Sequence, residues 1–487
     1  MERAAPHPLP APASRSPREW AQRVYAFAQL PDRRLKTRLI RVAEGLAAAP
    51  SDSLPQTFED WGQVKGAYRF VANQRVKPES LGRALPPSTA LRCAGEELVL
   101  VVQDTTFLTF PPACHAEGLG PINDKPSRGI ALHSALALRP DGLSLGVAHL
   151  HSWCRPKSQP PARRRANRPI EEKESFRWLE AMRAVHEAFQ ENLEPHERPR
   201  LCHVCDREGD IHELFALAEE LGDAVVVRCA RNRRVEVDEA LDKAHDAISR
   251  LPAQAVLQLA VPRKPGQAAR PATVEIRFQR QTLSPSQSAP SQRRRGKVRL
   301  WLVEVREPNP PEGVAPLHWR LWTNEPVQTL EEALRIVDIY CQRWRIEEYH
   351  RVLKEGCRIE QVRFRTAERI RSAIALYAPV ALRIVELRDL ARACPDRSCA
   401  IFLGETEWRV LWTLQHKRPP APGQEPPTVA QAIRWIGALG GHLGRKRDGR
   451  PGTKTLWRGF RDLQLLVEYE EVRERLLRNR RARAGPP

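Results

Sequence analysis

The stretch ELVLVVQDTTFLTF, residues 97–110, carries the strongest fold signal in this chain. It is rich in apolar and β-branched residues, which is typical of a buried strand. Two strand-like stretches follow, GIALHSALAL at 129–138 and SLGVAHLHSW at 144–153, so the three together predict a meander. The next expected elements are a helix opened by PIEE at 169–172, a strand, turn and helix at 201–221 and a strand at 224–231. Strands followed by strand–helix alternation predict a mixed α/β sheet.

The expected organisation is a central α/β unit flanked by helical regions. Residues 235–328 contain strand-like stretches separated by polar Pro/Ser loops, which predicts an antiparallel β insertion within the central unit. Apolar residues at helical spacing predict helices before and after it. The predicted division is a disordered Pro/Ala-rich extension (1–18), a helical domain (19–81), the central domain (82–365), a second helical domain (366–475) and a basic tail (476–487).

The chain is strongly basic. Its 487 residues include 79 Lys and Arg against 59 Asp and Glu, a formal net charge of +20. An excess of this size indicates a polyanionic partner, with nucleic acid as the first candidate. Arginine outnumbers lysine by 66 to 13, which suits bidentate phosphate contacts, although GC-rich codon usage would give the same ratio. Three small basic helices expected in 19–81 are typical of a DNA-binding module, and an ordinary solvated helical face is the alternative.

Targeting signals and cysteine chemistry narrow the class further. No apolar run approaches the ~18 residues that a membrane span needs, and the first residues contain no apolar signal-peptide core. Ten cysteines scattered over a long chain favour a reducing cytoplasm. The pair Cys202-x2-Cys205 has no partner pair at zinc-ribbon spacing, so we do not expect zinc. These features predict a cytoplasmic, nucleoid-associated protein with no membrane partner.

Two aspartates follow strand-like stretches. Asp104 comes at the end of LVLVVQD, and Asp206 comes directly after LCHVC. Carboxylates just past strand ends lie at the edge of a sheet, where ligands usually bind. Each also has a structural alternative, since Asp104 could belong to a turn and Asp206 could cap a helix.

Residues 329–356, TLEEALRIVDIYCQRWRIEEYHRVLKEG, predict one long helix that a capping box opens and a glycine ends. Four of its polar residues fall at offsets of 0, 3, 7 and 14: Tyr340, Arg343, Glu347 and Lys354. At 100° per residue they lie within about 60° of one face, in a stripe ~21 Å long. A tyrosine, two cations and a carboxylate in one stripe are typical of a phosphate-tracking edge that contains a metal ligand. The alternative is an ordinary solvated face.

Three carboxylates brought together would suit phosphodiester chemistry. Cleavage must neutralise charge on a non-bridging oxygen and on the entering and leaving oxygens, which two Mg²⁺ ions about 3.5–4 Å apart can do. Mg²⁺ prefers oxygen ligands and retains waters, so a few carboxylates suffice. Without metal such carboxylates repel one another and their pKa values rise, so metal binding should order the site.

Three motifs carry a family resemblance: QDTT at Asp104, CDREGDIHEL at Asp206 and the spacing Tyr340-x2-Arg343-x3-Glu347-x6-Lys354. Together they resemble the bacterial cut-and-paste DDE transposases with the Y-R-E-K signature, the insertion-sequence-four family. The likeness extends over nearly the whole chain. It includes the DRR-K-TRL helix, IEEKES at 170–175, HWRLWTNEPV at 318–327 and LGRKRDGRPGTKTLWRG at 443–459.

The resemblance implies a fold and a set of roles. The fold is α/β, an RNase H-like mixed-sheet catalytic core with an antiparallel β insertion, flanked by N-terminal and C-terminal helical domains. The implied metal ligands are Asp104, Asp206 and Glu347, and the implied phosphate-gripping residues are Tyr340, Arg343 and Lys354. Trp319 matches a tryptophan that stacks on a flipped base during a hairpin step, and its alternative is a core aromatic. Trp322, on the opposite strand face, is the expected core residue, and Arg228 matches a DNA-contacting arginine.

The resulting hypothesis is a Mg²⁺-dependent transposase, with Mn²⁺ able to substitute. It would act as a homodimer in a synaptic complex on double-stranded transposon ends and join them to target DNA, with the C-terminal helices supplying the protein–protein contact. Two alternatives remain: an RNase H-fold nuclease without strand transfer, and a catalytically silent DNA-binding regulator. The presence of all three acidic positions and the whole signature argues against loss of catalysis.

Overall fold

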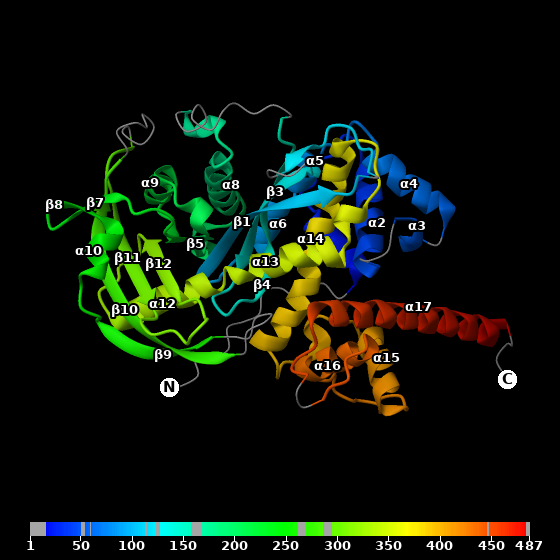
Figure 1. Ribbon diagram of the computed structural model, residues 1–487. Helices are drawn as coiled ribbons and strands as arrows, with labels where there is room; N and C mark the ends of the chain where they lie inside the picture. The colour runs from blue at the N-terminus through cyan, green and yellow to red at the C-terminus, as the bar shows by residue number, and fades with distance from the viewer. Residues whose placement is uncertain are drawn as a thin grey trace.

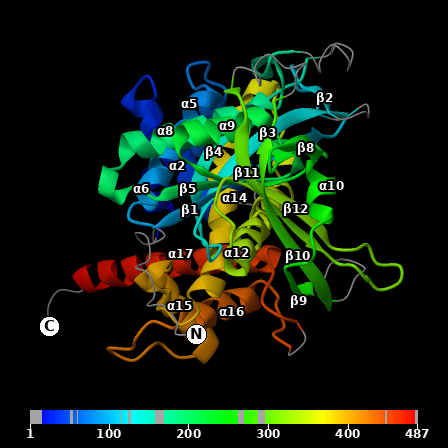
Figure 2. The same cartoon turned by 90° about the vertical axis from the view of Figure 1, so that its left-hand side faces the viewer.

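The computed structural model describes residues 16–49, 54–58, 60–112, 114–122, 127–156, 168–261, 269–285, 295–445 and 448–483. Side chains are described only as far as residue 477. A large twisted sheet occupies the centre, N-terminal helices pack at one end of it, and C-terminal helices gather below it (Figure 1). The view turned by 90° shows the same separation, with α15, α16 and α17 on one side of the molecule (Figure 2).

The N-terminal region is helical, as its apolar spacing predicts. Side chains of Ser16, Asp32 and Asp60 each accept a backbone N–H at a helix start, which satisfies a donor that the helix itself leaves unpaired. The helices are α1 (Pro17–Val24), α2 (Arg33–Ala48), α3 (Leu54–Thr57), α4 (Trp61–Val71), α5 (Pro78–Gly82) and α6 (Leu85–Arg92). Because α1 begins at Pro17, the expected disordered extension is wrong for its last two residues; residues 1–15 lie outside the described part.

The sheet is mixed, as expected. The strands β1 (Leu98–Phe110), β3 (Ser127–Leu138) and β4 (Ser144–Trp153) form the predicted antiparallel meander, and the short β2 (Gly120–Ile122) adds to β3. On its other side β1 pairs in parallel with β5 (Arg200–Cys205), which pairs in parallel with β6 (Ala224–Arg228). Three antiparallel strands next to two parallel ones, covered by helices, form an RNase H-like core.

The β insertion continues this sheet and does not form a separate one. Its last strand pairs with β6, which gives the strand order β2-β3-β1-β5-β6-β12-β11-β10-β7-β8. The strands are β7 (Arg234–Val237), β8 (Ala240–Lys243), β9 (Ala255–Val261), β10 (Arg270–Leu283), β11 (Val298–Arg306) and β12 (His318–Thr323). The pairings within the insertion are antiparallel, as expected, but the helix α10 (Ala244–Ser249) was not predicted.

Both faces of the central strands are buried. Leu100, Val102 and Val204 point to the face that packs in one core with residues of the 330–359 helices and of α14. Val101 and Leu201 point to the other face, which α8 (Phe176–Asn192) and α9 (His212–Leu221) cover. The helix α8 begins at Phe176, and residues 170–172 form a separate 3₁₀ turn, so the single helix expected from Pro169 is wrong.

The predicted helix over 329–356 is interrupted. Its capping box at Thr329 is confirmed, but α12 spans only Leu330–Cys341, and a second helix, α13, spans Trp344–Arg351. Between the two helices, backbone hydrogen bonds join residues three apart instead of four, as from Arg345 N–H to Gln342 C=O. This tighter turn rotates α13 relative to α12. Val352–Gly356 then forms a π turn whose final glycine lies so close to Trp457 that a Cβ would come within 2.9 Å of its ring. Tertiary packing against the C-terminal helices accompanies this second irregularity.

The C-terminal region consists of α14 (Ala367–Ala393), α15 (Glu405–His416), α16 (Val429–Leu439) and α17 (Thr453–Arg483). The apolar stretch around Pro379 is a buried core helix, as predicted. The basic tail expected from residue 476 is helical as far as Arg483, because α17 continues through it. No helix in the described ranges is both long and apolar enough to cross a membrane.

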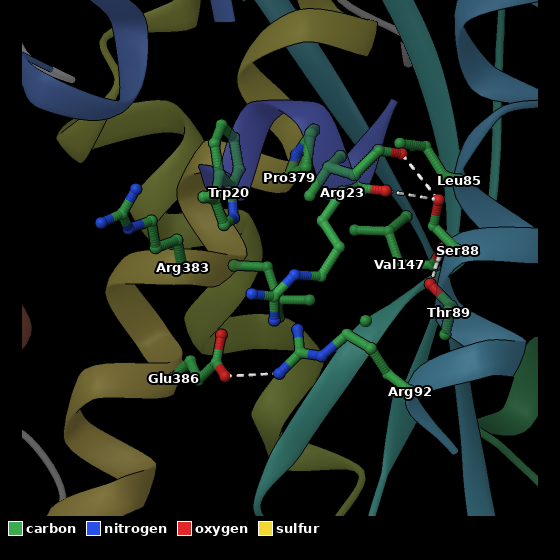
Figure 3. Close-up of a pocket in the computed structure, with 13 residues that line it drawn as sticks. Trp20, Arg23, Leu85, Ser88, Thr89, Arg92, Val147, Pro379, Arg383 and Glu386 are labelled. Atoms are coloured by element: carbon green, nitrogen blue, oxygen red, sulfur yellow. Dashed lines mark hydrogen bonds and ion pairs between the residues drawn. The ribbon is translucent and has the colours of Figure 1, made fainter. Parts of the chain in front are cut away.

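Three regions of the chain meet at one joint (Figure 3). The Arg383 guanidinium of α14 lies over the ring of Trp20 in α1, 5.5 Å from its centroid, and over the ring of Phe460 in α17, at 5.8 Å. Beside it, Arg92 of α6 donates to Glu386 of α14 at 2.5 Å. The joint surrounds a cavity of only about 50 Å³. The helix α14 therefore connects the N-terminal helices, the sheet and the C-terminal helices.

Candidate active site

Asp104 is on β1, and Asp206 directly follows the neighbouring parallel strand β5. The parallel pairing of β1 with β5 reaches Val102 opposite Val204, and continuing that register by two residues brings Asp104 opposite Asp206. Alternation keeps both aspartates on the face of Val102 and Val204, which the 330–359 helices cover. The side chains from two distant stretches of sequence thus come together at the point where β5 ends.

The backbone surroundings of Asp104 and Asp206 differ from the two simple strand ends that the sequence predicts. Asp104 does not end β1, because antiparallel pairing with β3 continues through Asp104–Ser134 as far as Phe110. Asp206 does follow β5, and its carboxylate also accepts the N–H of Glu208 at 2.8 Å as the cap of a 3₁₀ turn. The capping alternative for Asp206 is therefore correct as well, and it leaves one oxygen of that carboxylate without a described partner.

Asp104 has the most perturbed carboxyl group of the site. Its side chain is 17% exposed. Burial, together with the charges of Asp206 and Glu347, raises its pKa to about 7, against the opposing effect of Arg343. Burial is the largest cause of this rise, and the neighbouring carboxylates add to it.

Glu347 completes the acidic group from α13. Its carboxylate forms an ion pair with Arg343 in the last turn before that helix. Among the described residues no set of three or more His, Cys, Asp or Glu side chains is already arranged around a common point as a metal site. The three carboxylates therefore interact electrostatically, but Glu347 is directed toward Arg343 and not toward a shared centre.

The polar stripe is not one straight helical face, because the helix breaks between Tyr340 and Glu347. Tyr340 is on α12 and only 6% exposed. Its ring packs against Trp319 of β12 at 6.0 Å in an edge-to-face geometry. Burial raises the pKa of Tyr340, and the nearby Arg343 and Arg228 oppose that rise. The structure thus brings Trp319, Tyr340 and Arg228 into one cluster beside Arg343.

The remaining predicted residues lie around this cluster. Lys354 is in the π turn, half-buried, and its charge helps lower the pKa of His350, mainly an effect of burial, to about 3. Trp322 is fully buried against the face covered by α9, so its expected place in the core is confirmed. The sequence also contains two basic loops that we expect to face DNA, at 155–168 and 282–296, and both lie mostly outside the described residues.

Sequence reasoning missed two neighbours of the site. His350 approaches the carboxylate of Asp104 to 3.7 Å, and its ring is neutral at ordinary pH because its pKa is so low. Trp344, between Arg343 and Arg345, exposes 55% of its surface. Both residues belong to the stretch QRWRIEEYH, which also contains Arg343 and Glu347. Their closeness in sequence to these two residues was the signal that could have identified them.

Known families match three parts of this chain. Residues 17–76 match the family described as transposase DNA-binding, residues 211–381 match the transposase DDE domain, and residues 379–476 match the transposase Tn5 dimerisation domain. The chain belongs to the DDE transposases. The middle match includes Tyr340 and Glu347, and its end meets the next match within α14, near the joint at Arg383.

One solved structure is similar over much of this length: a piggyBac transposase synaptic complex with hairpin DNA. It shares 11% sequence identity, and the match covers 96% of this chain and 76% of that one with a TM-score of 0.35. Likeness at this level carries no argument about the site. The family matches make this transposase an enzyme of DNA cleavage and strand transfer with DNA-binding and dimerisation regions, of a class that uses divalent metals.

In this transposase a network of buried ion pairs and hydrogen bonds joins α13 to α14 and to the start of β4. Glu348, next to Glu347, pairs with Arg388 of α14, and Arg345 donates to Asp389 at 2.8 Å. Asp389 also accepts from Ser144 at 2.7 Å, at the start of β4. Buried ion pairs of this kind fix geometry more than they add stability. The orientation of Glu347 is thus tied to the helix that enters the dimerisation region.

Proposed function

We propose that this protein is a cut-and-paste transposase whose catalytic residues are Asp104, Asp206 and Glu347. The observation that carries the proposal is the proximity of three carboxylates: Asp104 on β1 and Asp206 directly after the parallel strand β5, with Glu347 close enough to add to the raised pKa of Asp104. This transposase would cut one strand at each transposon end, form a hairpin, reopen it and join the end to target DNA.

The donor chemistry fits a divalent metal. Three carboxylates, two of them repelling each other at a buried edge, supply the oxygen ligands that Mg²⁺ prefers, with Mn²⁺ able to substitute. When bound there, the metal would supply charge neutralisation and an activated oxygen nucleophile. Glu347 would have to leave Arg343 to join Asp104 and Asp206, which frees the Arg343 guanidinium for a DNA phosphate.

The cluster next to the carboxylates is suited to hold the DNA end. Arg343 and Lys354 offer cations to phosphates, and Arg228 adds a third at the end of β6. Trp319 is half-buried against Tyr340 and offers an aromatic surface for a base displaced in the hairpin step. Stacking of this kind is worth ~1–3 kcal/mol per base. The N-terminal helices, in the proposed domain 19–81, would bind the outer part of the end.

A homodimer would form through α17. Four apolar residues are spaced along one side of this helix and are exposed by 46–67%: Leu465, Tyr469, Val472 and Leu476. Their spacing of four, three and four residues produces a single stripe that suits a second copy of the same helix. In Figure 1, α17 extends beyond the packed helices α15 and α16. A synaptic complex would pair two such chains on two DNA ends.

Asp104→Asn and Glu347→Gln variants test the proposal with DNA that carries the element's own inverted repeats. Wild-type protein should cut and join this DNA with Mg²⁺, while both variants should bind it with unchanged affinity and fail to cut. A matched control is Glu405→Gln, an exposed glutamate of α15 that pairs with Arg409 of the same helix. Cutting by Asp104→Asn at the wild-type rate would refute the site, and wild-type cutting without joining would favour the nuclease.

A further inference from the structure

A second polar pocket opens at the same edge of the sheet, on its other face. Its volume is about 500 Å³. Thr105 and Phe107 of β1 line it together with Trp178 of α8 and His212 of α9. Because successive strand residues point to opposite faces, Thr105 faces away from the side of Asp104. The lining contains none of the Tyr340 and Trp319 cluster, so the two sites are separate.

Glu174, in the IEEKES segment, organises one wall of this pocket. Its carboxylate accepts from Arg155 Nε at 2.7 Å and from the second Arg155 nitrogen at 2.6 Å, and also from Trp153 Nε1 at 3.2 Å. The Arg155 guanidinium lies over the ring of Phe107, 4.5 Å from its centroid. The carboxylate thus holds a flat guanidinium and two aromatic side chains in place. The catalytic carboxylates do not explain why the IEEKES motif is present at 170–175. These contacts of Glu174 give the motif a structural role in the pocket wall.

Three cations of the pocket have no carboxylate partner among the described residues: Lys173, Arg207 and Arg231. Arg233, in contrast, is paired with Asp210 at 2.9 Å. Glu208 also lines the pocket and forms no ion pair with a described residue, so an acceptor lies among these donors. At the buried end, His212 is 1% exposed and neither of its ring nitrogens hydrogen-bonds to a described side chain. The pocket therefore contains donors and acceptors that no described side chain pairs with.

We propose that this pocket binds one unpaired nucleotide of a DNA strand that passes around the edge of the sheet. Its phosphate would lie among Lys173, Arg207 and Arg231, and its base would stack on the wall held by Glu174. Arginine planes and aromatic rings are the usual stacking surfaces for unpaired bases. A carboxylate such as Glu208 repels a bare phosphate but accepts from the amino group of a base. The inference rests on the proposed function, because it adds a second DNA subsite to the same enzyme.

The test measures binding of single strands to the full-length protein in EDTA, so that no cleavage occurs. The probes are a short fluorescent oligo(dC) and an abasic strand of equal length. Lys173→Ala with Arg231→Ala should weaken oligo(dC) binding about 10-fold and reduce the slope of log affinity against log salt by about 1. The control removes the same charge at two exposed arginines that form no ion pair with the described residues, Arg418→Ala in the loop after α15 and Arg434→Ala in α16, and should leave both quantities unchanged.

A second variant separates base from phosphate. Glu174→Gln releases Arg155 and Trp153, so it should weaken oligo(dC) about 10-fold and leave the abasic strand unaffected. Equal binding of the two strands by wild-type protein would reduce the pocket to a phosphate site and overturn the proposal, as would unchanged affinity in the Lys173, Arg231 double variant. Failure of the proposed function is distinguishable, because that failure would appear as absent end cleavage while the binding differences remain.

Discussion

Replacing Asp104 with asparagine should stabilise the metal-free protein above neutral pH. Its folded-state pKa of about 7 lies well above the ordinary value of 3.8, so the ionised carboxylate destabilises the folded state. The rise corresponds to an upper limit of about 4 kcal/mol. Asparagine loses part of the charge-assisted bond from Thr105 N–H to the carboxylate, so a net gain of about 2 kcal/mol is expected. This gain appears fully only where Asp104 is ionised.

The pH dependence follows from the direction of the shift. Between the unfolded value near 4 and the folded value near 7, the folded state holds more protons on Asp104 than the unfolded state does. The destabilising contribution is therefore complete above pH 7 and disappears as the pH falls toward 4. Thermal unfolding of wild-type and Asp104→Asn protein in EDTA should differ by several degrees at pH 8 and by almost nothing at pH 4.5.

Mg²⁺ provides the second arm of this experiment. It should raise the unfolding temperature of wild-type protein at pH 8, because bound ligand stabilises the folded state, and should have little effect on the variant. Asp396→Asn is a matched control, since this aspartate is exposed in the turn that follows α14. A variant that is less stable than wild type at pH 8, or a gain that is independent of pH, would refute the assignment of a repelled carboxylate at Asp104.

Four further outcomes are expected. Lys354→Ala should weaken end-DNA binding about 10-fold and reduce the salt slope by about 1; an unchanged slope in a titration would exclude a phosphate contact. Trp319→Ala should slow hairpin formation 10- to 100-fold while the first nick continues, which gels of cleavage products resolve, and equal loss of both steps would argue against stacking. Arg388→Ala removes the nearest cation from the carboxylate of Glu348 and should cost at most ~3–5 kcal/mol in thermal unfolding, whereas an unchanged midpoint would show that the network is dispensable. Leu465→Glu with Leu476→Glu should give a folded monomer by light scattering and circular dichroism, and a persistent dimer would place the interface elsewhere.

Much of the fold follows from local sequence. The strand at Leu98–Phe110 was predictable because the stretch is rich in apolar and β-branched residues and contains no glycine or proline. The capping box at Thr329 was predictable because it depends on residues three apart. The motifs around Asp104, Asp206 and Glu347 identified the transposase family, since their spacing is specific. Each of these signals depends on a few neighbouring residues or on a fixed spacing.

Other features depend on contacts between distant segments. No glycine or proline marks the break after Cys341, so a single helix was the reasonable prediction, and only the packed structure shows that Tyr340 and Glu347 lie on separate helices. Asp104 lies within β1 and not at a strand end, because β3 continues to supply hydrogen bonds beyond Asp104 after β5 has ended. The link from Glu348 to Arg388 joins residues 40 apart in sequence, which no local pattern reveals.

The sequence by itself determined the class of chemistry: the three acidic residues, the signature cations around them and a net charge of +20 suited to DNA. Tertiary structure alone decided how these residues face one another. The parallel register of β1 and β5 brings Asp104 beside Asp206, and burial there raises the pKa of Asp104. The physical reason is that composition and spacing are properties of the chain, whereas desolvation and charge repulsion depend on which segments pack together.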